Sequence, residues 1–155
     1  MERKLRREDR AMPESEARDI LQAGEYGILS TVSNDGQPYG VPVSYAYTGE
    51  VIYFHCAVEG HKLDNLSSNN RVSFCVVGQT QVLPDKFATN YESVVVFGKA
   101  FEVTDDEKHA GLVELLKKYS PDFIEKGQRY IAGDGHKAKV YKIVIESMTG
   151  KARKK

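Results

Sequence analysis

The stretch that decides the fold is YGILSTVSNDGQPYGVPVSYAYTGEVIYFHCAV, residues 26–58. Larger apolar residues alternate along it with small or polar ones, which is typical of strands with one buried face. Asn34-Asp35-Gly36 interrupts the alternation once and Thr48-Gly49-Glu50 interrupts it again. Both are turn sequences of the kind that join antiparallel strands. The segment therefore predicts an antiparallel meander with short loops.

The rest of the chain adds strands and helices to this meander. We expect helices over residues 13–23, 61–68, 105–119 and 121–127, and further strands over residues 71–78, 91–104 and 138–147. The polar, proline-containing segment 79–90 is predicted to be a loop with at most a short strand. Five or six antiparallel strands with helices around them predict an α+β fold, an antiparallel β-barrel with peripheral helices.

Local signals refine these expectations. Gly98 lies inside a strand pattern and predicts a bend or bulge. Thr104 and Glu107 have the spacing of a capping box, which starts a helix. That helix carries one apolar stripe, expected to be buried: Leu112, Leu115, Leu116 and Tyr119.

Size and composition limit the function classes. The 155 residues predict a single domain, 1–155, with a charged N-terminal arm at 1–12 and a basic C-terminal tail at 149–155. With 22 basic and 22 acidic side chains, the chain lacks the positive surplus of a nucleic-acid binder. It also lacks an apolar run of membrane-spanning length. Two isolated cysteines predict a reducing compartment, the cytoplasm, and no structural metal.

The strand over residues 40–47 has two unequal faces. One face carries large residues and is the predicted core face: Val41, Val43, Tyr45 and Tyr47. The other carries small ones: Gly40, Pro42, Ser44 and Ala46. Because Pro42 cannot donate to a strand ladder, it places this strand at an edge. The small face favours either a shallow groove for a flat molecule or contact with a neighbouring helix.

Two neighbouring features carry titratable groups. His55 falls on the face of its strand opposite Phe54 and Cys56, where it is either a hydrogen-bonded structural residue or a group beneath a ligand. Gly60-His61-Lys62 opens the helix that follows, and free backbone N–H groups there favour an anion. The alternative is an ordinary helix start with exposed side chains. Tyr91 and Ser93 are polar positions at the start of a valine-rich strand, which is either a plain core strand or one with polar contacts at its solvent-exposed end.

The ordered set GQPYGVPVSYAY (36–47), VIYFHCAVEGHKLDNLSSNNRVSF (51–74), TNYESVVVFGKAFEV (89–103) and KIVIESMTGKA (142–152) resembles the pyridoxamine 5′-phosphate oxidase-related flavoproteins. Within them it resembles the subgroup related to 5-nitroimidazole resistance proteins. The resemblance implies a split β-barrel and a homodimer with FMN in a cleft between the subunits. Compared with the classical oxidases, the phosphate segment is short and the C-terminal arginine motif for a substrate phosphate is missing.

Carried onto this chain, the resemblance implies a set of cofactor-binding residues: Val41, Pro42, Val43, Ser44, His55, Cys56, His61, Lys62, Tyr91, Ser93 and Val94. Of these, the first four would line the flavin ring, His61 and Lys62 would hold the phosphate, and the last three would reach the cofactor from the dimer-related subunit. The implied function is reduction of a small oxidised molecule such as a nitroaromatic, with His55 as proton donor. The alternative is a non-catalytic module that holds flavin or haem.

Overall fold

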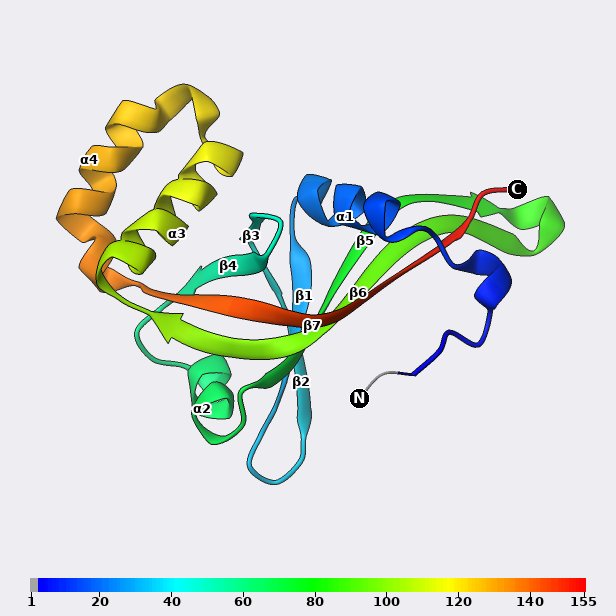
Figure 1. Ribbon diagram of the computed structural model, residues 1–155, viewed down its shortest axis with the longest axis horizontal. Coiled ribbons are helices and arrows are strands. Elements are labelled where there is room, and N and C mark those ends of the chain that lie inside the picture. The colour runs from blue at the N-terminus through cyan, green and yellow to red at the C-terminus, as the bar shows by residue number, and fades with distance from the viewer. Residues whose placement is uncertain (1–2) are drawn as a thin grey trace.

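The computed structural model describes residues 3–155, and its centre is one antiparallel sheet of seven strands in the order β2-β1-β5-β6-β7-β4-β3 (Figure 1). The strands are β1 (Gly27–Val32), β2 (Pro38–Val43), β3 (Tyr45–Tyr47), β4 (Val51–Cys56), β5 (Arg71–Leu83), β6 (Ala88–Val103) and β7 (Lys139–Arg153). The predicted α+β class and the antiparallel split barrel are confirmed. So is the first hairpin, whose turn uses Gly36 at a φ of 88°.

The two outermost strands of the sheet, β2 and β3, are consecutive in the chain. Only Ser44 separates them, although each lies at a different edge of the sheet. The sheet must therefore curl until its two edges meet at Ser44, which closes the barrel without a ladder between them. Pro42 lies on the β2 edge, as predicted from its missing N–H.

The core fills the inside of this curl. The single strand expected over residues 40–47 is broken at Ser44 into β2 and β3. Its large residues still point inward, with Val43, Tyr45 and Tyr47 buried, but Ala46 of the expected small face is buried as well. Tyr45 packs edge-on against Phe74, with ring centres 4.9 Å apart. The bulge expected at Gly98 is present, since the register of β6 against β7 shifts between Phe97 and Gly98.

Four helices surround the sheet: α1 (Glu14–Ala23), α2 (His61–Ser68), α3 (Asp105–Tyr119) and α4 (Ile124–Asp134). Helix α1 covers β6 and β7, α2 packs near β1, and α3 packs on β3, β4 and β7. Helix α4 packs on α3, so the two form a layer at one end of the sheet (Figure 1). Within residues 3–155, no helix has the length and apolar character needed to cross a membrane.

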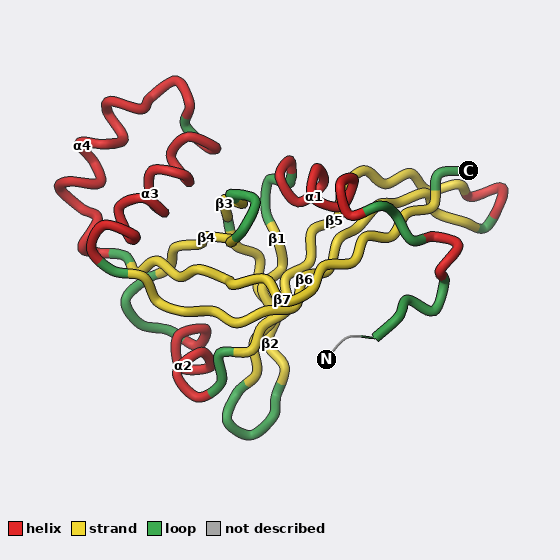
Figure 2. Tube along the Cα trace, viewed as in Figure 1, coloured by secondary structure: helices red, strands yellow, loops and turns green. Residues whose placement is uncertain are grey.

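Three sequence predictions about element bounds are wrong. Residues 79–83 continue β5, and residues 80–83 pair with residues 88–91, so the expected loop is a long hairpin that extends beyond the core (Figure 2). Its polar composition arises because both faces are exposed there. Helix α4 does not end at Gly127 but runs to Asp134, because Gly127 is a close-contact site against Leu116. Residues 149–153, expected as tail, form the end of β7.

Two predictions about α3 also fail. Thr104 makes no capping hydrogen bond. Instead, the Glu107 carboxylate accepts a hydrogen bond of 3.1 Å from the Tyr53 hydroxyl and lies 3.1 Å from Lys142 Nζ, which ties α3 to the sheet. Of the apolar stripe only Leu115 is fully buried, because the stripe faces a cleft.

The N-terminal arm lies against the sheet. Glu8–Arg10 form a short 3-10 turn, and Ala11 makes a bridge to Lys151 of β7. The backbone N–H of Met12 donates to Gly150, and the Met12 side chain packs on the core. These contacts hold the end of the charged arm expected over 1–12 against the sheet; residues 1 and 2 of that arm lie outside the described residues.

Candidate functional site

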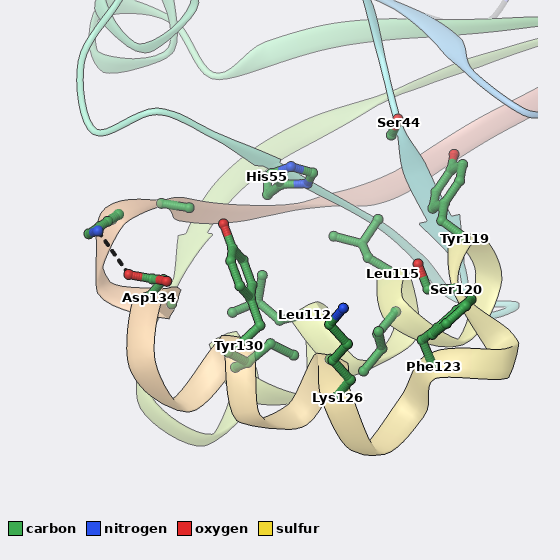
Figure 3. Close-up of a pocket in the computed structure, with 16 residues that line it drawn as sticks. Ser44, His55, Leu112, Leu115, Tyr119, Ser120, Phe123, Lys126, Tyr130 and Asp134 are labelled. Carbon is green, nitrogen blue, oxygen red and sulfur yellow. Dashed lines mark ion pairs between the residues drawn. The ribbon is translucent and has the colours of Figure 1, made fainter.

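A cleft of about 870 Å³ lies between α3, α4 and the strand end at His55 (Figure 3). Ser44 precedes Tyr45 and His55 follows Phe54, so the two residues flank the last pair of the β3–β4 ladder, and both line the cleft. The point at which the two sheet edges meet therefore carries the two polar residues singled out from the sequence. This is the first element of the candidate site.

His55 lines the cleft and is exposed, although neighbouring protein atoms displace part of the water around its ring. Burial lowers the pKa of His55, and the positive charge of Lys62 lowers that pKa further. The ring is therefore mainly neutral at neutral pH and can donate one hydrogen bond and accept another. The same lysine lowers the pKa of Cys56, against a larger opposing effect of burial. Lys62 thus lies within electrostatic range of His55, although it belongs to a different element.

The start of α2 forms the second element. Gly60 precedes the helix at a φ of 149°, with open space where a side chain would project. No side chain caps the helix N-terminus, and Lys62 is half-buried. Among residues 3–155 no carboxylate lies within ion-pair distance of Lys62. A half-buried cation without a partner beside free helical N–H groups is an anion-binding arrangement.

The side chains around α2 are held in place. The ring of His61 lies over Tyr39 of β2, with centres 4.1 Å apart. Buried Asn65 donates a hydrogen bond of 3.0 Å to Thr31 of β1, which anchors the helix to the sheet. The structure therefore brings His61 and Lys62 next to the β2 edge.

The other residues expected to bind the cofactor of their own subunit differ in orientation. Pro42 and Ser44 are exposed, Val41 is partly buried, and Val43 belongs to the core. Cys56 points to the face opposite His55, where its thiol is buried and lies 3.8 Å from the carbonyl oxygen of Lys139. Val43 and Cys56 can therefore reach a ligand only through their backbone atoms.

Tyr91, Ser93 and Val94 lie far from His55 in the same chain. His55 pairs with Val140, which pairs with Val103 at the end of β6, whereas Tyr91 is near the start of that strand. The separation spans most of a 16-residue strand, roughly 40 Å at the rise of an extended chain. The Tyr91 end lies on the hairpin that extends away from α3 and α4 (Figure 1). Val94 is buried in the core, and Ser93 is on the outer face.

Sequence reasoning missed the helical wall of the cleft. Phe123, Lys126 and Tyr130 line it, and Figure 3 shows Tyr130 and Lys126 directed from α4 toward the strand that carries His55. Residues 124–134 have apolar positions at helical spacing, which could have identified α4. Because the predicted helix ended at Gly127, Tyr130 was not placed on it.

Comparison with known proteins gives the family. The family model described as pyridoxamine 5′-phosphate oxidase matches residues 13–152. This chain belongs to that family. The curled sheet, which closes into a barrel at Ser44, agrees with membership of the pyridoxamine 5′-phosphate oxidase family.

Individual relatives are more distant. The uncharacterized protein RA0666 of Rhizobium meliloti (strain 1021) is 33% identical over 96 residues, which are 61% of this chain and 57% of that protein. The chain thus matches little more than half of the length of this relative.

Solved structures of other proteins share the fold. A candidate 5-nitroimidazole antibiotic resistance protein from Bacteroides thetaiotaomicron VPI-5482 has a TM-score of 0.75 at 23% identity, over 92% of this chain and 86% of the other. An FAD-binding protein from Mesorhizobium loti has a TM-score of 0.68 at 26% identity, over 94% and 98%.

Proposed function

We propose that this member of the pyridoxamine 5′-phosphate oxidase family binds FMN and, as a homodimer, reduces a small oxidised molecule such as a nitroaromatic. The observation that carries the proposal is Lys62. It is half-buried, has no ion-pair partner within residues 3–155, opens α2 and lies within electrostatic range of His55. The FAD-binding relative from Mesorhizobium loti supports a flavin in this fold.

The residues near Lys62 fit the two ends of FMN. A phosphate dianion at the start of α2 would form an ion pair with Lys62. It would also accept hydrogen bonds from His61 and from the free N–H groups of the first turn. The flat ring would lie along β2, where Pro42 and Ser44 are exposed and one side of the strand has no partner strand. When bound, the flavin would supply two-electron redox chemistry between an external two-electron donor and the acceptor.

His55 would donate one of the protons that this reduction consumes. Conversion of a nitro group to a nitroso group consumes two electrons and two protons and releases water. A phosphate near Lys62 would offset the charge that lowers the pKa of His55, so the imidazole would gain proton occupancy as the site fills. His55 could then donate a proton from a ring nitrogen into the cleft.

A second copy of the chain would complete the site. Tyr91 and Ser93 cannot reach the flavin of their own chain, because they lie at the other end of β6. They share the outer face of the sheet with partly exposed apolar residues, Val95 and Phe97 among them, and Val77 pairs directly with Ser93. An exposed apolar sheet face of this kind is typical of a subunit contact.

The test compares FMN with riboflavin, which lacks the phosphate. Fluorescence titration of flavin-free protein is expected to show that Lys62→Ala weakens FMN binding about 10-fold to 100-fold, the loss of one charge-assisted contact, and leaves riboflavin affinity unchanged. Lys86→Ala, on the turn of the β5–β6 hairpin, is the matched control. Equal loss for both flavins in Lys62→Ala would contradict the phosphate site.

The wild-type protein provides the direct check. It should bind FMN with a flavin absorption spectrum, and the reduced sample should be reoxidised by a nitroaromatic under anaerobic conditions. A Soret band after reconstitution with haem, without flavin binding, would favour the alternative of a haem-binding module. A flavin that binds but is reoxidised by none of a panel of acceptors would reject the oxidoreductase part of the proposal.

A further inference from the structure

The cleft between α3 and α4 has an apolar wall and a polar end, which is the usual composition of a small-molecule site. Leu112, Leu115 and Leu116 form its base. Aromatic residues stand at its rim, and two of them are largely exposed, Phe123 at 61% and Tyr130 at 69%. Large aromatic side chains left open around a concave surface indicate that a ring-shaped ligand covers them.

The polar groups of the cleft are mainly donors. Lys126 and Tyr130 come from α4, and Ser44 and His55 come from the sheet (Figure 3). Within residues 3–155 Lys126 has no carboxylate at ion-pair distance. The one acidic residue of the lining, Asp134, is already paired with Lys137 at 2.8 Å. The cleft therefore has an uncompensated positive charge beside an aromatic wall.

We propose that this cleft binds the second reactant of the flavin site, and that this reactant is a flat aromatic molecule with one anionic oxygen group. The rings would pack on the leucines and on Phe123, while the anion would meet Lys126 and the Tyr130 hydroxyl. Ser44 lines the cleft and directly follows the last residue of β2, so a molecule held here would lie beside a flavin bound along β2. This inference rests on the proposed function for the identity of the reactant, but the binding itself does not require a flavin.

The test uses 2-naphthoate, its neutral analogue 2-naphthamide and the non-aromatic anion cyclohexanecarboxylate as probes. Calorimetry on the flavin-free protein is expected to show naphthoate binding at least tenfold tighter than either of the other two. Lys126→Met should abolish the preference for naphthoate over naphthamide. Phe123→Ala should weaken both naphthalene probes several-fold. Both residues are solvent-accessible, so the fold should tolerate the substitutions.

Arg129→Met is the matched control, because Arg129 lies on the same helix and pairs with Glu125 outside the cleft. Isotope-labelled leucine methyl groups should show the naphthoate shifts concentrated on Leu112, Leu115 and Leu116. Three results would overturn the proposal: equal affinity for naphthoate and naphthamide, unchanged naphthoate affinity in Lys126→Met, or competitive displacement of naphthoate by FMN. Since FMN binding is read separately from Lys62→Ala, failure at the cleft and failure at the flavin site are distinguishable.

Discussion

The hydroxyl of Tyr119 accepts a hydrogen bond of 3.0 Å from the backbone N–H of Tyr45, beside the point where the two edges of the sheet meet. The same hydroxyl bonds the carbonyl of Glu25, just before β1. Beside it, Lys118 Nζ donates to the carbonyl of Tyr45 at 2.9 Å and lies 3.6 Å from the centre of the Tyr45 ring. The C-terminal turn of α3 therefore supplies the backbone partners that β3 lacks at its free edge.

Tyr119→Phe should lower the free energy of unfolding by about 1–2 kcal/mol, because it removes one partner from the Tyr45 N–H and another from Glu25. Urea denaturation measures the change. Tyr26→Phe is the control, since Tyr26 is 59% exposed and near the same loop. Equal stability of Tyr119→Phe and wild type would show that water replaces these contacts.

The pKa of His55 should respond to charge at α2. Since burial and Lys62 both lower this pKa, Lys62→Met is expected to raise it toward the ordinary value of 6.5. NMR titration of the imidazole protons measures the shift, and the spectrum of His55→Gln assigns the signal. Lys86→Met should leave the titration of His55 unchanged. A titration unaffected by Lys62→Met would place the lysine too far away to hold a shared ligand.

The lowered pKa also has a consequence for stability. The unfolded chain takes up a proton at His55 before the folded chain does as the pH falls, so the free energy of unfolding should decrease below about pH 6.5. His55→Gln should lack this part of the decrease. Denaturation midpoints of the two proteins at pH 7.5 and pH 5.5 provide the comparison, and an identical pH dependence would contradict a lowered pKa of His55.

Gly98→Ala should be strongly destabilising. A Cβ at residue 98 would lie 2.2 Å from the carbonyl oxygen of Val144, a backbone atom that cannot rotate away. We expect a loss of about 2 kcal/mol or more, together with a disturbed β6–β7 register. Gly40→Ala is the control, because its new methyl group would meet neighbours at an ordinary 3.5 Å. Thermal unfolding of both variants should separate them clearly.

Subunit mixing tests the shared flavin site. If Lys62 of one subunit and Tyr91 of the other serve the same flavin, Lys62→Ala and Tyr91→Ala homodimers should each bind FMN weakly. After denaturation and joint refolding in equal amounts, about a quarter of the sites should regain wild-type affinity, because each mixed dimer carries one intact site. Either variant refolded alone is the control. No recovery on mixing would reject the contribution of Tyr91 across the dimer.

Much of the fold was predictable from local pattern. The two hairpins within 26–58, the helices at 61–68 and 105–119 and the bulge at Gly98 all depend on residues close in sequence, whose alternation and turn chemistry are visible in one strand or one helix. The break at Ser44, which sends β2 and β3 to opposite edges of the sheet, was not visible in this local pattern. The long β5–β6 hairpin was missed because, with both faces in solvent, its strands lack the apolar alternation that marks a buried face.

The candidate site was predictable only in part. Helix α2 begins at the predicted residue, and both Ser44 and His55 line the cleft. Glu107 shows the limit of local reasoning. Its carboxylate was expected to cap α3 but contacts Tyr53 and Lys142 instead, which are far away in the chain. Lys126 and Tyr130 were missed for the same reason, since their position depends on how α4 packs against α3.

The sequence by itself determined that this chain forms an antiparallel barrel with a short helix after residue 60, because strand alternation, turn residues and helix starts are set by neighbours within a few positions. The tertiary structure decided which of those residues meet. It brought Ser44 and His55 into one cleft and put Tyr91 at the end of β6 that lies far from that cleft. Such contacts follow from sheet register and helix packing, which depend on the whole core at once.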